Sequence, residues 1–338
     1  MEGKQILAEP KPIAEASKRI PGLRVIRNSP PAESFLLEAD PYFGLDEPQA
    51  IDSEIVEGNR LAAHSVSDIG KSDFTHFVDG AQTSRLAYEV YGVCGYLSFI
   101  NAAVLCREGK EILNEHCDYE ELLAIFHVDE NSEAKEIFEE IGWKVIPVVY
   151  DVNKGLAGLR ELVLDKISET RYEMETKLAK RWMESSEGWL YIDGGVAKLC
   201  TSLSSFCPIV GVVKSHRKQY FKTRDAREVI LNLKVGERSS VFIARTGQQR
   251  DEAYSWYLRL YDDSGSSASY GLVRIEMPPF EETMRWVDSV SAWLIAETTP
   301  LSLPDPRYDR LIYPIRRVEV YLKSHQPSAT RLQGWIGY

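Results

Sequence analysis

Two short stretches, FVDG at Phe77–Gly80 and YIDG at Tyr191–Gly194, predict both the fold and the chemistry of this 338-residue chain. Each is an apolar run typical of a buried strand, followed by an aspartate at the strand's carboxyl end and a glycine that permits a sharp exit. If the two strands are neighbours in one sheet, both carboxylates lie at the same edge. Each motif alone is more typical of an ordinary turn, in which the aspartate accepts a backbone hydrogen bond, whereas two motifs with similar flanks fit a turn and a site equally.

Paired carboxylates at a strand edge favour a divalent cation, because close negative charges repel and Mg²⁺ or Mn²⁺ prefers oxygen ligands. Two such ions about 3.5–4 Å apart can activate a water molecule and stabilise the leaving oxygen of a phosphodiester. The two motifs together therefore indicate a metal-dependent nuclease.

A third carboxylate is expected from the long helix that leads into the second strand. Apolar residues recur there at steps of three to four, which predicts a helix over 156–185. Glu173, Glu175 and Glu184 are the candidates, and Glu175 flanks the apolar stripe four residues after Arg171. The alternative is an exposed glutamate paired with Arg171 or Lys177 on the helix surface.

The remaining pattern predicts an α/β fold, a mixed sheet flanked by helices. The expected strands are 73–80, 85–91, 95–106, 122–128, 189–193, 209–213, 240–244, 253–261 and 271–276, and the expected helices are 52–67, 156–185, 225–233, 280–296 and 314–324. Residues 1–70, with their proline-rich linkers, form an N-terminal extension that contacts a second copy or a partner. Residues 71–338 form the nuclease domain, with an acidic insertion at about 107–145 on one edge.

Charge is segregated along the chain. The formal net charge is −11, and residues 107–140 alone carry three basic against twelve acidic residues. In contrast, residues 305–338 carry six basic residues against three acidic ones, and residues 214–227 read KSHRKQYFKTRDAR. A basic groove for a sugar-phosphate backbone and a plain solvated surface fit these segments equally. The residues expected to contact nucleic acid are Lys214, Arg217, Lys218, Lys222, Arg316 and Arg317.

Several classes of protein are disfavoured. No apolar run reaches the roughly 18 residues of a membrane span, and the amino terminus has charges where a signal peptide needs an apolar stretch. The five cysteines include no C-x-x-C pair, which favours a reducing cytoplasm. No phosphate-binding loop of the G-x-x-x-x-G-K-[ST] kind occurs, so ATP hydrolysis would have to come from another chain.

The order of the motifs resembles that of the NurA family of nucleases over roughly residues 73–338. The matching pieces are Asp79-Gly80, Arg171 with Glu175, Asp193-Gly194, Gly211-Val212-Val213-Lys214, Arg274-Ile275-Glu276 and Tyr313-Pro314. The resemblance implies an RNase H-like core and a homodimer that works on DNA with a HerA-like hexameric ATPase. The implied role is DNA end processing or defence against phage. The low overall basicity is compatible with this role if the ring threads the DNA and the acidic insertion faces away from it or docks the partner.

The resemblance also implies roles for individual residues. Asp79, Glu175 and Asp193 would hold two Mn²⁺ or Mg²⁺ ions, and Lys214 would counter charge at the scissile phosphate. Tyr313 would lie near the site.

The sequence departs from the family pattern at three places. Ala81 and Gly195 stand where the family commonly has serine, and Tyr321 stands at the position of its late histidine. His325, one helical turn later, is the nearest histidine, and Glu319 is the alternative polar residue. A catalytically weakened interaction subunit and an RNase H-like nuclease that acts alone on RNA or structured DNA are therefore the alternative functions.

Overall fold

The computed structural model describes residues 9–30, 52–67, 70–109, 111–129, 132–149, 155–185, 187–214, 219–246, 251–262, 267–298 and 312–337. The strands are β1 (Leu23–Val25), β2 (Ala63–Ser65), β3 (Phe74–Val90), β4 (Val93–Glu108), β5 (Glu111–Asp129), β6 (Val145–Val149), β7 (Trp189–Asp193), β8 (Ile209–Val213), β9 (Glu237–Ser239), β10 (Phe242–Thr246), β11 (Asp251–Arg259) and β12 (Leu272–Met277). The helices are η1 (Ile13–Lys18), α2 (Ser132–Glu140), α3 (Leu156–Ser185), α4 (Ala197–Cys200), α5 (Arg224–Leu231), η2 (Glu281–Arg285), α6 (Val287–Ala296), α7 (Tyr313–His325) and α8 (Ala329–Ile336).

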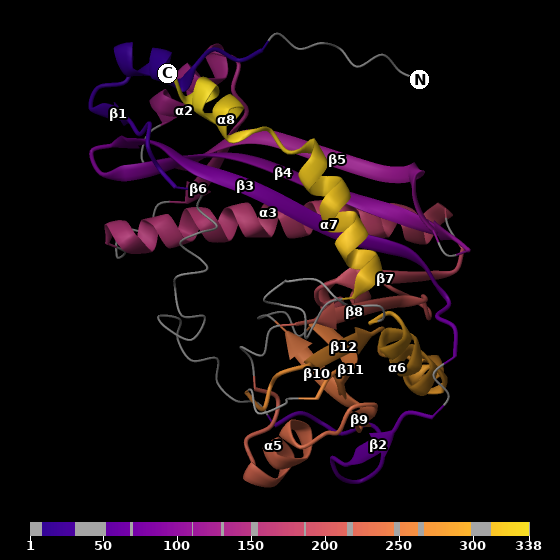
Figure 1. Cartoon of the computed structure of the whole chain (residues 1–338). Helices are drawn as coiled ribbons and strands as arrows, with labels where there is room; N and C mark the ends of the chain where they lie inside the picture. Colours follow the sequence, from indigo (N-terminus) through magenta and orange to yellow (C-terminus); the bar gives the residue numbers. More distant parts are fainter. Residues whose placement is uncertain are drawn as a thin grey trace.

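One mixed sheet runs through the molecule in the order β2-β9-β11-β12-β8-β7-β3-β4-β5-β6 (Figure 1). Its centre is a meander of three antiparallel strands, β5-β4-β3, followed by β7 and β8, which run parallel to β3. This is the strand arrangement of an RNase H-like core, as expected from the sequence. The β12 strand then joins β8 in antiparallel fashion and connects the core to the lower half of the sheet.

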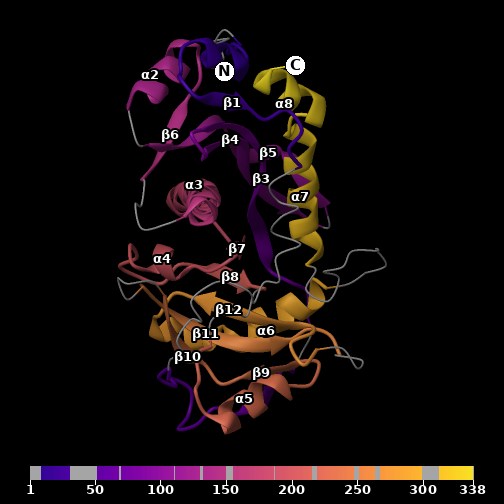
Figure 2. The same cartoon turned by 90° about the vertical axis from the view of Figure 1, so that its left-hand side faces the viewer.

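Two helices cover opposite faces of the central strands (Figure 2). The α3 helix buries Val163, Ile167 and Leu178 in one apolar cluster, and α7 buries Val318 and Leu322 in a second. The β4 strand lies between the two layers, so nearly all of its side chains are buried. That double burial explains why its sequence is a near-continuous apolar run rather than an alternating one. No helix in the described part of the chain has the length and apolar character needed to cross a membrane.

Two sequence-based expectations about local structure are wrong. The helix expected over 52–67 is extended chain, with β2 paired to β9 and Gly58 at a φ of 76° that a helix does not hold. The strands expected at 73–80 and 85–91 are one strand, β3, because the polar residues between them continue the pairing with β4, for example Thr83 with Phe99. The helix over 156–185 is confirmed at both ends.

The acidic segment at 107–145 is part of the sheet. Most of it forms β5 and α2, and β6 begins where it ends, at the edge of the sheet beyond β5. Two of its acidic residues pair with α3, since Asp118 and Glu120 both contact the Arg181 guanidinium, at 2.8 and 2.9 Å. These acidic residues therefore hold α3 against β5.

Gly211 in β8 permits close packing next to the end of β7. A Cβ atom at this position would lie 2.6 Å from the Gly194 carbonyl oxygen and 2.9 Å from a Val196 methyl group. We expect Gly211→Ala to lower the free energy of unfolding by about 1–3 kcal/mol, measured by urea denaturation. The control is Gly334→Ala in α8, where nothing lies within 4 Å of the added methyl group. Alanine should be neutral or stabilise there by up to about 1 kcal/mol, and equal losses in the two variants would contradict the packing argument.

Candidate metal centre

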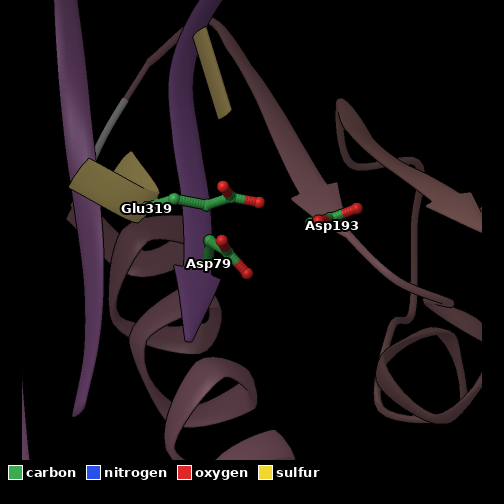
Figure 3. A group of neighbouring side chains, drawn as sticks. All are labelled: Asp79, Asp193 and Glu319. Atoms are coloured by element: carbon green, nitrogen blue, oxygen red, sulfur yellow. The ribbon is translucent and has the colours of Figure 1, made fainter. Parts of the chain in front are cut away.

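Three carboxylates from three elements meet at one edge of the central sheet. Asp79 comes from β3, Asp193 ends β7, and Glu319 comes from the middle of α7 (Figure 3). Each offers an oxygen atom, and these atoms all lie within 4.8 Å of one another. The parallel pairing of β3 with β7, which aligns Val78 with Ile192, places the following two aspartates side by side. The juxtaposition that the two Asp-Gly motifs suggest is thus present.

The position of Glu319 follows from the way α7 packs. Ile315, Val318 and Leu322 form the buried stripe of this helix, and Glu319 flanks that stripe. Asn101 in β4 donates a hydrogen bond of 2.9 Å to the Leu322 carbonyl oxygen, which ties the helix to the sheet. The helix therefore presents its only described carboxylate to the two aspartates.

Lys214 provides a positive charge at this edge. Its Nζ atom lies 2.8 Å from both carboxylate oxygens of Asp193. Lys214 directly follows β8, which runs parallel to β7, so both side chains leave the sheet at neighbouring strand ends. Strand topology therefore fixes this ion pair.

A buried ion pair supports the loop that follows Asp193. Glu276 in β12 accepts hydrogen bonds from the backbone amides of Val196 and Ala197, at 2.7 and 3.2 Å, and pairs with the Arg274 guanidinium through its other oxygen. Both charged residues are more than 90% buried. Because a carboxylate bonded to two backbone amides holds their chain segment in place, this pair fixes the exit from β7.

Glu175 lies beside the three carboxylates but outside the group of mutually close oxygens. It is 5% exposed, and its Oε1 accepts a hydrogen bond of 3.0 Å from Arg171, as the four-residue spacing suggests. A Cβ atom at Gly80 would approach this oxygen to 2.2 Å, so a larger residue after Asp79 would displace the Glu175 carboxylate. The same Arg171 donates to the Gly80 carbonyl oxygen at 3.2 Å, which ties α3 to β3.

The crowding of buried carboxylates is visible in their pKa values. Burial, with added repulsion from Asp193 and Glu175, raises the pKa of Asp79 well above its ordinary value, and Lys214 only partly opposes this. Burial also raises the pKa of Glu175 to about 7, against the attraction of Arg171. A site of this kind gains from a cation, and its all-oxygen donor set fits a hard divalent ion such as Mg²⁺ or Mn²⁺.

An open cleft leads away from the carboxylates. It is lined by Asp79, Gly80, Ala81 and Gln82 of β3, Ser168 and Arg171 of α3, Asp193 of β7, Glu319 and Lys323 of α7, and Gln326. The acidic residues gather at one end and the basic ones, Arg171 and Lys323, lie along its walls. The three carboxylates therefore line a cleft that opens to solvent.

The other predicted site residues lie farther from the centre. Tyr313 and His325 are the two ends of α7, each about 9 Å along the helix axis from Glu319, and neither lines the cleft. His325 is exposed and contacts the rings of Tyr119 and Tyr321. The predicted nucleic-acid contacts Lys222 and Arg317 are exposed and Arg316 is half-buried, whereas Arg217 and Lys218 lie outside the described residues.

The comparisons with known proteins give similarities in structure but none in sequence. No protein-family model and no curated protein sequence matches the chain. Among solved structures, the crystal structure of the NurA nuclease from Sulfolobus solfataricus is similar, with 11% sequence identity, 84% of each chain covered and a TM-score of 0.42. A similarity of this degree assigns neither an activity nor individual residues to the present chain, so its function must be argued from its own site.

The raised pKa of Glu175 predicts a pH-dependent stability in the absence of metal. Between pH 4.5 and about 7 the folded state binds more protons than the unfolded state at this carboxyl, so the free energy of unfolding falls as pH rises through that window. We expect Glu175→Gln to lessen this fall in thermal melts in a chelating buffer from pH 5 to 8. The matched control is Glu173→Gln, an exposed residue of the same helix, which should keep the wild-type slope. Equal slopes in all three proteins would contradict the prediction.

Proposed function

We propose that this protein is a metal-dependent nuclease that hydrolyses phosphodiester bonds in DNA. The observation that carries the proposal is the convergence of Asp79, Asp193 and Glu319, with their oxygens within 4.8 Å, at the end of an open cleft. Asp79 is buried and the other two are half-buried, so the carboxylates repel one another, and an arrangement that destabilises the fold is expected where function requires it.

The ligands of the ion would be Asp79, Asp193 and Glu319, with Glu175 as the next nearest carboxylate. When bound, Mg²⁺ or Mn²⁺ supplies a polarised water molecule and neutralises negative charge on a phosphate group. The sequence resemblance suggests two ions and the set Asp79, Glu175 and Asp193. The geometry adds Glu319 to that set, and four carboxylates are a fitting donor set for two divalent cations.

The chain's own residues would prepare the site for a phosphate group. Lys214 keeps a fixed ammonium group at Asp193, in a place where negative charge on the phosphate grows during hydrolysis. The Glu276 contacts to the loop after β7 hold Asp193 in position, so little reorganisation is needed when substrate arrives. Arg171 keeps Glu175 oriented beside Gly80.

The proposed partners rest on the sequence resemblance alone. On that ground we propose a homodimer that digests DNA delivered by a HerA-like hexameric ATPase, in end processing or anti-phage defence. The lack of a phosphate-binding loop in the sequence agrees with an ATPase on a separate chain. The overall charge of −11 agrees with a nuclease that receives its DNA from a partner rather than attracting it over long range.

Amide substitutions test the metal centre because they keep the side-chain shape and remove the charge. We expect Asp79→Asn, Asp193→Asn and Glu319→Gln each to lower the rate of DNA hydrolysis in Mn²⁺ by at least about a hundredfold. The assay uses linear double-stranded and single-stranded DNA, with and without a ring ATPase. The affinity for Mn²⁺, measured by calorimetry, should fall in the same variants.

The matched control is Glu184→Gln, an exposed glutamate near the end of α3, which should hydrolyse DNA at the wild-type rate. Hydrolysis by the wild type and all amide variants at the same rate would contradict the proposed centre. A wild-type protein that binds a ring ATPase but never cleaves DNA would instead support the alternative of a catalytically weakened interaction subunit.

A further inference from the structure

The cleft beside the carboxylates has a second half in which the charge is reversed. Going away from Asp79, its described lining residues are Gln82 on β3, Ser168 and Arg171 on α3, and Lys323 and Gln326 at the end of α7. This half contains two cations, two amides and a hydroxyl, and no carboxylate among the described residues that line it. Such a wall fits a phosphate group rather than a second cation.

The floor of this half is an unpaired strand edge. The β3 strand pairs with β7 only up to Val78 and with β1 only from Tyr88 onward, so the edge between them has no strand partner in the described part of the chain. Both ends of this stretch are in use, since the Gly80 carbonyl oxygen accepts a hydrogen bond from Arg171 and the Leu86 carbonyl oxygen accepts one from Ser29. The backbone groups between them, around Gln82, have no strand beside them in the described part of the chain and can contact a ligand. The Gln82 side chain adds to them, since its Oε1 atom is buried and has no hydrogen-bond partner within the described residues.

The two cations stand on opposite walls of the cleft. Arg171 comes from α3 on one face of the sheet and is held by the Gly80 carbonyl oxygen and Glu175. Lys323 comes from α7 on the other face, one helical turn after Glu319 and therefore about 6 Å along the axis from this carboxylate. A chain lying on the edge of β3 would pass between them.

We propose that this half of the cleft, the β3-edge cleft, binds the phosphate next to the scissile one in a single nucleic acid strand. The proposal rests on the proposed nuclease function, which puts the scissile phosphate at the carboxylates. Lys323 and Arg171 then bind the neighbouring phosphate, while Gln82 and Gln326 contact the sugar or base. Lys214 lies at the Asp193 side of the carboxylates, so cations flank the cleavage position on both sides.

Charge reversal at Lys323 tests the β3-edge cleft without any need for turnover. The probe is a fluorescein-labelled 12-nucleotide strand of thymidylate, and its binding is followed by fluorescence anisotropy in EDTA over a range of salt concentrations. We expect Lys323→Glu to weaken binding at least about tenfold, because it removes a charged hydrogen bond. The slope of log affinity against log salt should fall in magnitude by about 0.7, the loss of one phosphate contact. Lys323→Arg should retain wild-type binding.

The matched control is Lys135→Glu, the same charge change at a half-buried lysine of α2, which packs at the far end of the sheet on β5 and β6. Equal binding by Lys323→Glu, Lys135→Glu and wild type would overturn the proposal. If charge reversal prevents folding, the neutral Lys323→Gln variant decides the matter by the same measurement. If the wild type binds the strand through Lys323 but cleaves nothing in Mn²⁺, the β3-edge cleft stands and the nuclease function fails.

Discussion

The parallel pairing of β3 with β7 is the constraint on which the site depends. It brings two aspartates together although 113 intervening residues separate them in the sequence, and it does so through a register in which Val78 faces Ile192. A slip of one residue would turn Asp79 to the other face of the sheet, away from α7. The close approach of the elements around this pairing favours glycine at Gly211, where a Cβ atom would collide with the Gly194 carbonyl oxygen, and at Gly80, where it would displace the Glu175 carboxylate.

Burying several acids in one place costs stability, and the surrounding structure offsets only part of that cost. Lys214 compensates Asp193, and Arg171 compensates Glu175, yet the pKa of Asp79 and that of Glu175 both remain raised. By contrast, the buried ion pair of Arg274 and Glu276 has further hydrogen-bond partners. Arg274 donates to the Ser255 hydroxyl, and Glu276 accepts from two backbone amides. The ion pair that supports the β7 loop thus has its charges compensated, whereas at the site Asp79 and Glu175 keep raised pKa values.

The sequence predicts the parts of the site that depend on local patterns. An apolar run that ends in Asp-Gly indicates the carboxyl end of a strand wherever it occurs. The helical repeat from 156 to 185 places Glu175 beside a buried stripe. Glu319 depends instead on how α7 docks across β3 and β4, through the Asn101 bond to the Leu322 carbonyl oxygen. Nothing within the helix sequence specifies that crossing. The helix expected at 52–67 failed for a similar reason, since β2 forms by pairing with β9, about 170 residues later.

The long β3 strand links the two halves of the cleft. Its first residues pair with β7 and place Asp79, its last residues pair with β1, and the stretch between them keeps an open edge at the wall formed by α3 and α7. On its other side this stretch pairs with β4, with one register shift between Leu86 and Tyr88. The cleft along it begins at three carboxylates and continues between two cations, a charge order that fits a phosphodiester chain bound through its metal-held and its neighbouring phosphate.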